Sequence, residues 1–143
     1  MYHYTESGLQ NVWLKNGYTV HKTPYGKGMA ITDVAGLHKA IGLVLARLPK
    51  LTGAQFRFLR KEMGMSQKAI ATLLGTSEQN ISLWERRGHI PRPSDRLVKV
   101  LYNEHVRGDN LTIKGLIERI IAQDDAPQEK LEFENDNIWK EAA

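Results

Sequence analysis

The sequence contains no cysteine, which excludes a disulfide framework and a zinc site built on thiolates. It also has no apolar run that approaches the roughly 18 residues needed to cross a membrane. Its polar start, MYHYTESG, lacks the apolar core of a signal peptide. We therefore expect a soluble, cytoplasmic protein. With 143 residues and 41% hydrophobic content, the chain is long enough for one ordinary core plus an appendage.

Catalytic and cofactor-binding motifs are missing as well. The five histidines are scattered along the chain, and no two of them lie at i,i+4 beside a third ligand. There is no serine or cysteine nucleophile motif and no phosphate-binding glycine loop. We therefore expect that the protein is not an enzyme, and that it binds neither a metal nor a cofactor.

The formal net charge of +4 is unevenly distributed. Residues 46–100 contain 11 basic and 4 acidic side chains, whereas residues 124–143 contain 2 basic and 7 acidic side chains. A basic centre suits a polyanion such as DNA, and the acidic tail must then be kept away from it. Because a run of charge is also typical of a solvated face, this pattern favours nucleic acid only modestly.

Residues 66–87, SQKAIATLLGTSEQNISLWERR, have the pattern of two short helices joined by a tight turn. Apolar residues recur at helical spacing on both helices: Ile70, Leu74, Ile81 and Trp84. Ala71 is small where the helices must approach closely, and Gly75 suits a left-handed exit from the first helix. Ser77 is a typical N-cap for the second helix. The pattern predicts a helix-turn-helix whose second helix turns its polar face outward.

That polar face carries the residues that we expect to read DNA. Amide side chains donate and accept hydrogen bonds together, so Gln79 and Asn80 are the first candidates for contacts to base edges. Glu78 has the chemistry to accept a hydrogen bond from a cytosine amine. Alternatively, its negative charge stabilises the helix N-terminus through the helix dipole. Leu83 has the chemistry to contact a thymine methyl group. Phosphate contacts are expected from the surrounding basic residues, which are Lys68, Arg86, Arg87 and Arg92.

From about residue 51 to residue 101, the sequence resembles the Xre family of helix-turn-helix regulators, which includes the phage Cro and CI repressors. The residues that carry the resemblance are Ser66-Gln67, Ala71, Leu74-Gly75, Ser77, Ile81 and Trp84-Glu85. It implies base-reading positions at Glu78, Gln79, Ser82 and Leu83. It also implies that Gln67 contacts a phosphate and supports the second helix. Finally, it implies that Arg60 and Glu85 form a structural ion pair.

The N-terminal segment is predicted to contain strands and one helix. Asn16-Gly17 lies between β-prone residues and predicts a type I′ hairpin, and a second turn over residues 23–28 would complete a three-stranded meander. Its aromatic residues are more typical of a small core than of a stacking platform for bases: Tyr2, Tyr4, Trp13, Tyr18 and Tyr25. Asp33 is expected to cap a helix with apolar spacing up to Leu48.

The remaining segments complete an α+β fold. Thr52 and Gln55 have capping-box spacing for a helix over 53–63, and Pro93 suits the start of a helix to about residue 106, with Leu97, Val98, Leu101 and Tyr102 facing inward. A last helix is expected over 110–122. Residues 131–134 alternate like a strand, which either adds to the N-terminal meander with Trp139 as an anchor or belongs to a disordered acidic tail. The predicted units are a β-rich unit with a helix (1–49), the DNA-binding domain (50–107) and the C-terminal helix with its tail (108–143).

The function that the sequence predicts is therefore that of a sequence-specific transcriptional regulator. We expect a repressor that binds a pseudo-palindromic double-stranded operator as a homodimer. The alternative is an antitoxin that binds a toxin and represses its own operon. The layout is weakly similar to antitoxins of the MqsA type, although those hold zinc with cysteines and this chain has none.

Overall fold

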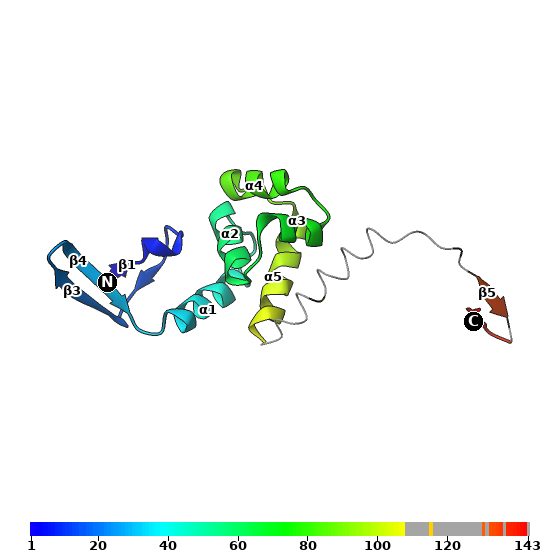
Figure 1. The fold of residues 1–143 in the computed structure, drawn as a ribbon, viewed down its shortest axis with the longest axis horizontal. Coiled ribbons are helices and arrows are strands. Elements are labelled where there is room, and N and C mark those ends of the chain that lie inside the picture. The colour runs from blue at the N-terminus through cyan, green and yellow to red at the C-terminus, as the bar shows by residue number, and fades with distance from the viewer. Residues whose placement is uncertain (108–114, 116–129, 131, 136, 143) are drawn as a thin grey trace.

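The computed structural model describes residues 1–107, 115, 130, 132–135 and 137–142. The elements in chain order are β1 (Tyr2–His3), the 3-10 helix η1 (Thr5–Ser7), β2 (Trp13–Leu14), β3 (Tyr18–Thr23), β4 (Gly26–Ile31), α1 (Val34–Leu45), α2 (Gly53–Glu62), α3 (Gln67–Leu74), α4 (Glu78–Arg87), α5 (Arg92–Val106), β5 (Phe133–Asn135) and β6 (Trp139–Glu141). Helices α1 to α5 form one helical body, and strands β1 to β4 lie at one end of it (Figure 1). The predicted α+β class is confirmed.

Helix boundaries follow the predicted capping residues. The Thr52 hydroxyl accepts from the Gln55 backbone N–H at 3.2 Å, and the Gln55 side-chain oxygen accepts from the Thr52 N–H at 2.9 Å. This is the complete capping box of α2. Ser66 and Ser77 each accept from the backbone N–H three residues further on, and Gly75 ends α3 with a φ of 70°. Local hydrogen bonds therefore determine where α2, α3 and α4 begin.

The hydrophobic core lies among the helices and includes residues from the N-terminal segment. The largest fully buried side chains are Tyr102, Phe56, Leu9, Leu51, Leu59, Ile70, Ile81 and Val98. Leu9 and Leu45 belong to the same cluster as the helix-turn-helix residues. Residues on both sides of the predicted boundary at 49–50 therefore share one core, and the division into units stays a prediction.

One predicted core position of α5 is wrong. Leu97 was expected to face inward, but it is 40% exposed. The buried face of α5 is formed instead by Asp95, Val98, Leu101 and Tyr102. The buried Asp95 carboxylate accepts from the Leu51 backbone N–H at 2.8 Å. Since this bond and the apolar residues share one face of α5, Leu97 is turned away from the core.

The N-terminal strands pair differently from the predicted meander. β1 pairs with β2, and β3 pairs with β4 over six residues from Tyr18↔Ile31 to Thr23↔Gly26. The predicted hairpin at Asn16-Gly17 is therefore wrong, whereas the predicted turn within 23–28 is confirmed. Gly17 has a φ of 78° and its carbonyl accepts from the Thr32 N–H at 2.8 Å. The longer ladder with β4 satisfies more backbone groups of β3 than the two-residue β2 offers.

The C-terminal strands form a separate hairpin. β5 pairs with β6 in antiparallel register, with Asn135 opposite Trp139. The predicted addition of this strand to the N-terminal sheet is therefore wrong, and Trp139 is 71% exposed rather than an anchor. Pairing with the adjacent segment requires closing only a very short loop, which costs the least chain entropy. The helix predicted over 110–122 lies outside the described residues, apart from Gly115.

Helix α1 begins after Asp33, whose carboxylate accepts from the Gly36 N–H at 3.0 Å, as its predicted role as N-cap requires. It ends at Leu45, earlier than the predicted end near Leu48. Among the helices that the structure describes, we find none that is both long and apolar enough to cross a membrane.

Candidate nucleic-acid interface

Helices α3 and α4 form the helix-turn-helix. Ile70 and Ala71 of α3 and Ile81 of α4 are buried in the same core, where the small Ala71 side chain permits close approach. α4 lies at the outer edge of the helical body (Figure 1). Its opposite side is therefore accessible along the length of the helix, and its N-terminal turn is the most exposed part.

The five predicted base-contacting residues differ in their exposure. Glu78, Gln79 and Asn80 are exposed, whereas Ser82 and Leu83 are partly buried. The Asn80 side-chain amide donates to the Thr76 hydroxyl at 2.9 Å, so part of its hydrogen-bonding capacity is already used within the protein. The side chains of Gln79 and Glu78 make no hydrogen bond or ion pair with any residue that the structure describes. Gln79 is therefore the amide most available to a base.

The predicted phosphate-contacting residues present positive charge around this face. Lys68, Arg86, Arg87 and Arg92 are exposed, and none of them forms an ion pair with another described residue. Gln67 is partly buried, and its side-chain amide lies 3.4 Å from the Glu85 carboxylate. Cations without acidic partners produce a positive potential that favours a polyanion.

A buried ion pair attaches α4 to the rest of the domain. Arg60 Nε donates to Glu85 Oε2 and its terminal nitrogen to Oε1, both at 2.8 Å. The other terminal nitrogen donates to the Met65 carbonyl at 2.9 Å. The Arg60 and Glu85 side chains are 9% and 5% exposed. This bidentate pair joins α2, the α2–α3 loop and the last turn of α4, and its geometry makes Arg60 unavailable as a DNA contact unless the pair opens.

Gly53 is a positioning residue that the sequence analysis missed. An added Cβ at Gly53 would lie 2.3 Å from the Glu85 carbonyl oxygen and 2.6 Å from that of Trp84. The first turn of α2 therefore contacts the backbone of α4 directly, at a place where only glycine fits. A glycine at the first position of a helix is unremarkable in sequence, so no local pattern indicates this contact.

A second missed feature links the N-terminal segment to α1 and α2. His38 Nδ1 lies 2.8 Å from Glu62 Oε1, and its Nε2 lies 2.7 Å from the Tyr4 hydroxyl. Burial raises the pKa of Tyr4, and the negative charges of Glu6 and Glu62 raise it further. These residues are far apart in sequence, so no spacing rule brings them together. Among the described residues, no group of three or more acidic or histidine side chains is placed so that it could hold a metal ion.

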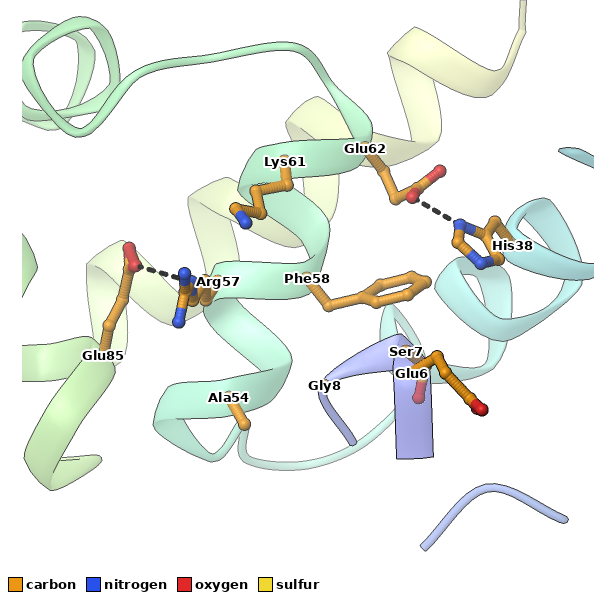
Figure 2. Close-up of a pocket in the computed structure, with 10 residues that line it drawn as sticks. All are labelled: Glu6, Ser7, Gly8, His38, Ala54, Arg57, Phe58, Lys61, Glu62 and Glu85. Atoms are coloured by element: carbon orange, nitrogen blue, oxygen red, sulfur yellow. Dashed lines mark hydrogen bonds and ion pairs between the residues drawn. The ribbon is translucent and has the colours of Figure 1, made fainter. Parts of the chain in front are cut away.

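The His38–Glu62 contact borders a pocket of about 380 Å³ (Figure 2). The pocket is lined by Glu6, Ser7, Gly8, His38, Ala54, Arg57, Phe58, Lys61, Glu62 and Glu85. Its walls therefore come from η1 and the residue after it, from α1, from α2 and from the C-terminal turn of α4. The N-terminal segment and the last turn of α4 thus face the same pocket.

Comparisons with known proteins agree with this geometry. Residues 56–99 match the family model described as helix-turn-helix, which spans the region from α2 into α5. Searches of curated proteins and of solved structures found no match to the chain. The family match, the α3–α4 arrangement and the exposed face of α4 together support a DNA-binding helix-turn-helix domain over residues 56–99.

Proposed function

We propose that the protein is a sequence-specific transcriptional repressor that places α4 in the major groove of double-stranded DNA. The observation that carries the proposal is the N-terminal turn of α4, where the side chains of Glu78 and Gln79 are exposed and make no hydrogen bond to the described residues. The buried face of the same helix is held by the Arg60–Glu85 pair. A recognition helix needs both properties, because its reading side chains must be available while its backbone is held rigidly.

The division of contacts follows from position on α4. Gln79 lies in the first turn, where a recognition helix comes closest to base edges. Arg86 and Arg87 lie in the last turn and reach the phosphate backbone. Ser82 and Leu83 lie in the middle of α4 and are partly buried. Only the exposed part of each side chain can therefore contact a base.

The experiment that tests the proposal is selection of bound duplexes from a random library with the full chain. Enrichment of one sequence family, bound more tightly than a scrambled duplex of equal length, would support it. Binding that is equal on selected and scrambled duplexes at physiological salt would contradict sequence-specific recognition.

Gln79→Ala and Arg87→Ala should separate sequence reading from general attachment. Gln79→Ala should weaken binding to the selected duplex by about 1–3 kcal/mol and have little effect on scrambled DNA, because an amide contact to a base edge is lost. Arg87→Ala should weaken both alike and lower the slope of log affinity against log salt by about 0.9, because one phosphate is no longer neutralised. Titrations of both variants on both duplexes across a salt series measure these effects. The opposite assignment of the two phenotypes would contradict this orientation of α4.

We also propose a homodimer, because the helical body leaves large apolar side chains uncovered. Leu43 and Val44, which are neighbours at the end of α1, are each more than one third exposed, and adjacent exposed apolar side chains are candidate contact points. Two-fold symmetry would present two copies of α4 to half-sites about one helical turn apart. Sedimentation equilibrium should give twice the chain mass of 16.2 kDa, and Val44→Lys should reduce it toward the monomer. A monomeric wild-type chain at micromolar concentration, with and without operator, would rule out the dimer.

A further inference from the structure

The β3–β4 ribbon, residues 18–31, has a charge pattern that the helix-turn-helix does not explain. Residues 7–32 contain no aspartate or glutamate, and they contain Lys15, Lys22 and Lys27 together with His21. All four of these side chains are exposed, and no ion pair joins them to another described residue. An acid-free basic segment in a chain with 16 acidic residues indicates a surface that is complementary to anions.

The register of the ribbon places two of these charges directly opposite each other. Lys22 pairs with Lys27 across the two strands, so both ammonium groups lie on the same face near the turn. Like charges directly opposite one another destabilise an antiparallel pair. A two-stranded hairpin is in any case only marginally stable. An anion between or beside the two ammonium groups would remove this repulsion.

The two faces of the ribbon differ near its turn, because the lysine pair shares its face with Val20 and Met29. On the face opposite the lysine pair the residues are small or polar: Thr19, His21, Thr23, Gly26, Gly28 and Ala30. The turn itself is held by Thr23, whose hydroxyl donates to the Gly26 carbonyl at 2.7 Å and accepts from the Tyr25 N–H at 3.3 Å. Tyr25 at the tip is fully exposed.

The ribbon is attached to the N-terminal segment, part of which lines a pocket together with the last turn of α4. The Tyr18 ring at its base lies against the Tyr2 ring, with 5.5 Å between centroids. Glu6 and Gly8, which follow β1, line the same pocket as Glu85 of α4 (Figure 2). From this base the ribbon extends away from the helices (Figure 1). Its six-residue strands span roughly 20 Å, which is about six base-pair steps of duplex DNA.

We propose that the β3–β4 ribbon is a second DNA-binding element, in which the Lys22–Lys27 pair binds backbone phosphates beside the site that α4 reads. The proposal rests on the proposed DNA-binding function of α4. DNA is favoured because neither the ribbon lysines nor Arg86 and Arg87 of α4 have an acidic partner among the described residues. The N-terminal segment that carries the ribbon also shares a pocket with the last turn of α4. Lysine ammonium groups bind phosphate as point charges without reading sequence. The ribbon therefore adds affinity and footprint length, but not base preference.

The test compares two duplexes that contain the selected sequence. The minimal duplex contains only the selected sequence, and the extended duplex adds about ten base pairs, one helical turn, on each side. The variant is the double substitution Lys22→Ala with Lys27→Ala in the full chain. The matched control is Lys39→Ala with Arg47→Ala, which removes one exposed charge from α1 and one from the segment just after it. Circular dichroism verifies that both variants are folded.

The wild-type chain should bind the extended duplex more tightly than the minimal one. The ribbon variant should lose this gain, and on the extended duplex its slope of log affinity against log salt should fall by about 1.8, which is two phosphates. The control should retain the gain. If the ribbon variant and the wild type bind the extended duplex equally, the inference is wrong. If Gln79→Ala changes binding on neither duplex, the proposed function of α4 fails as well, so the two failures are distinguishable.

Discussion

Arg60→Ala should lower the free energy of unfolding by about 3–5 kcal/mol, which is the usual effect of removing one partner from a buried ion pair. The substitution leaves the Glu85 carboxylate, only 5% exposed, without its bidentate donor. It also leaves the Met65 carbonyl without its donor. Because Arg57 lies 4.0 Å from the same carboxylate and is mostly exposed, it offers partial compensation, so we expect the lower end of this range. Chemical denaturation measures the change.

Arg57→Ala is the matched control, because it removes an arginine from the same helix and the same carboxylate. Its side chain is 58% exposed, so it should reduce the free energy of unfolding by less than about 1 kcal/mol. The double variant Arg60→Ala with Glu85→Ala should be less destabilised than the sum of the two single variants, because no buried charge then remains unpaired. An unchanged melting temperature for Arg60→Ala together with lost DNA binding would instead identify Arg60 as a DNA contact.

Gly53→Ala should be destabilising by about 1–3 kcal/mol or more, because a methyl group is forced into a closely packed backbone contact. The new Cβ would meet the Glu85 and Trp84 carbonyl oxygens at 2.3 and 2.6 Å. These atoms belong to the last turn of α4, so relief requires α4 to move relative to α2. We therefore expect weaker operator binding even under conditions where the variant is fully folded. Thermal denaturation and operator titration of the same preparation measure the two effects.

Gly64→Ala separates this steric effect from the general effect of losing a glycine. Gly64 has a φ of 69°, but an added Cβ there meets nothing within 4 Å. It should therefore cost about 1 kcal/mol of backbone strain and leave the operator affinity of the folded protein unchanged. Equal operator affinity for Gly53→Ala and the wild type would show that the position of α4 does not depend on the Gly53 contact.

The fold of the helical region was predictable because its signals are local. The hydroxyls of Thr52, Ser66 and Ser77 accept from N–H groups only three residues away, so the sequence of a single turn is enough to place each helix start. Helical periodicity likewise predicted that Ile70 and Ile81 are buried. The pairing of Arg60 with Glu85 was implied by the family resemblance alone, because no spacing rule connects two residues on different helices.

The strands were less predictable, because several partners compete for the same segment. Asn16-Gly17 is a strong hairpin signal in isolation, but β3 forms a longer ladder with β4. The pairing of β5 with β6 was missed for a related reason, since alternation identifies a strand without identifying its partner. Leu97 was misassigned because the apolar stripe of α5 was counted without the buried Asp95, which rotates the inward face.

For the candidate interface, the sequence by itself determined which helix presents the polar face and which side chains lie on it, because 3.6-residue periodicity depends only on order along the chain. Only the tertiary structure decided which of those side chains are available, since the Asn80 amide donates to Thr76 whereas Gln79 has no partner among the described residues. The tertiary structure also decided how α4 is held, through Arg60 and the close backbone contact at Gly53. Such contacts join segments that are distant in sequence, and they form only when all the helices pack together.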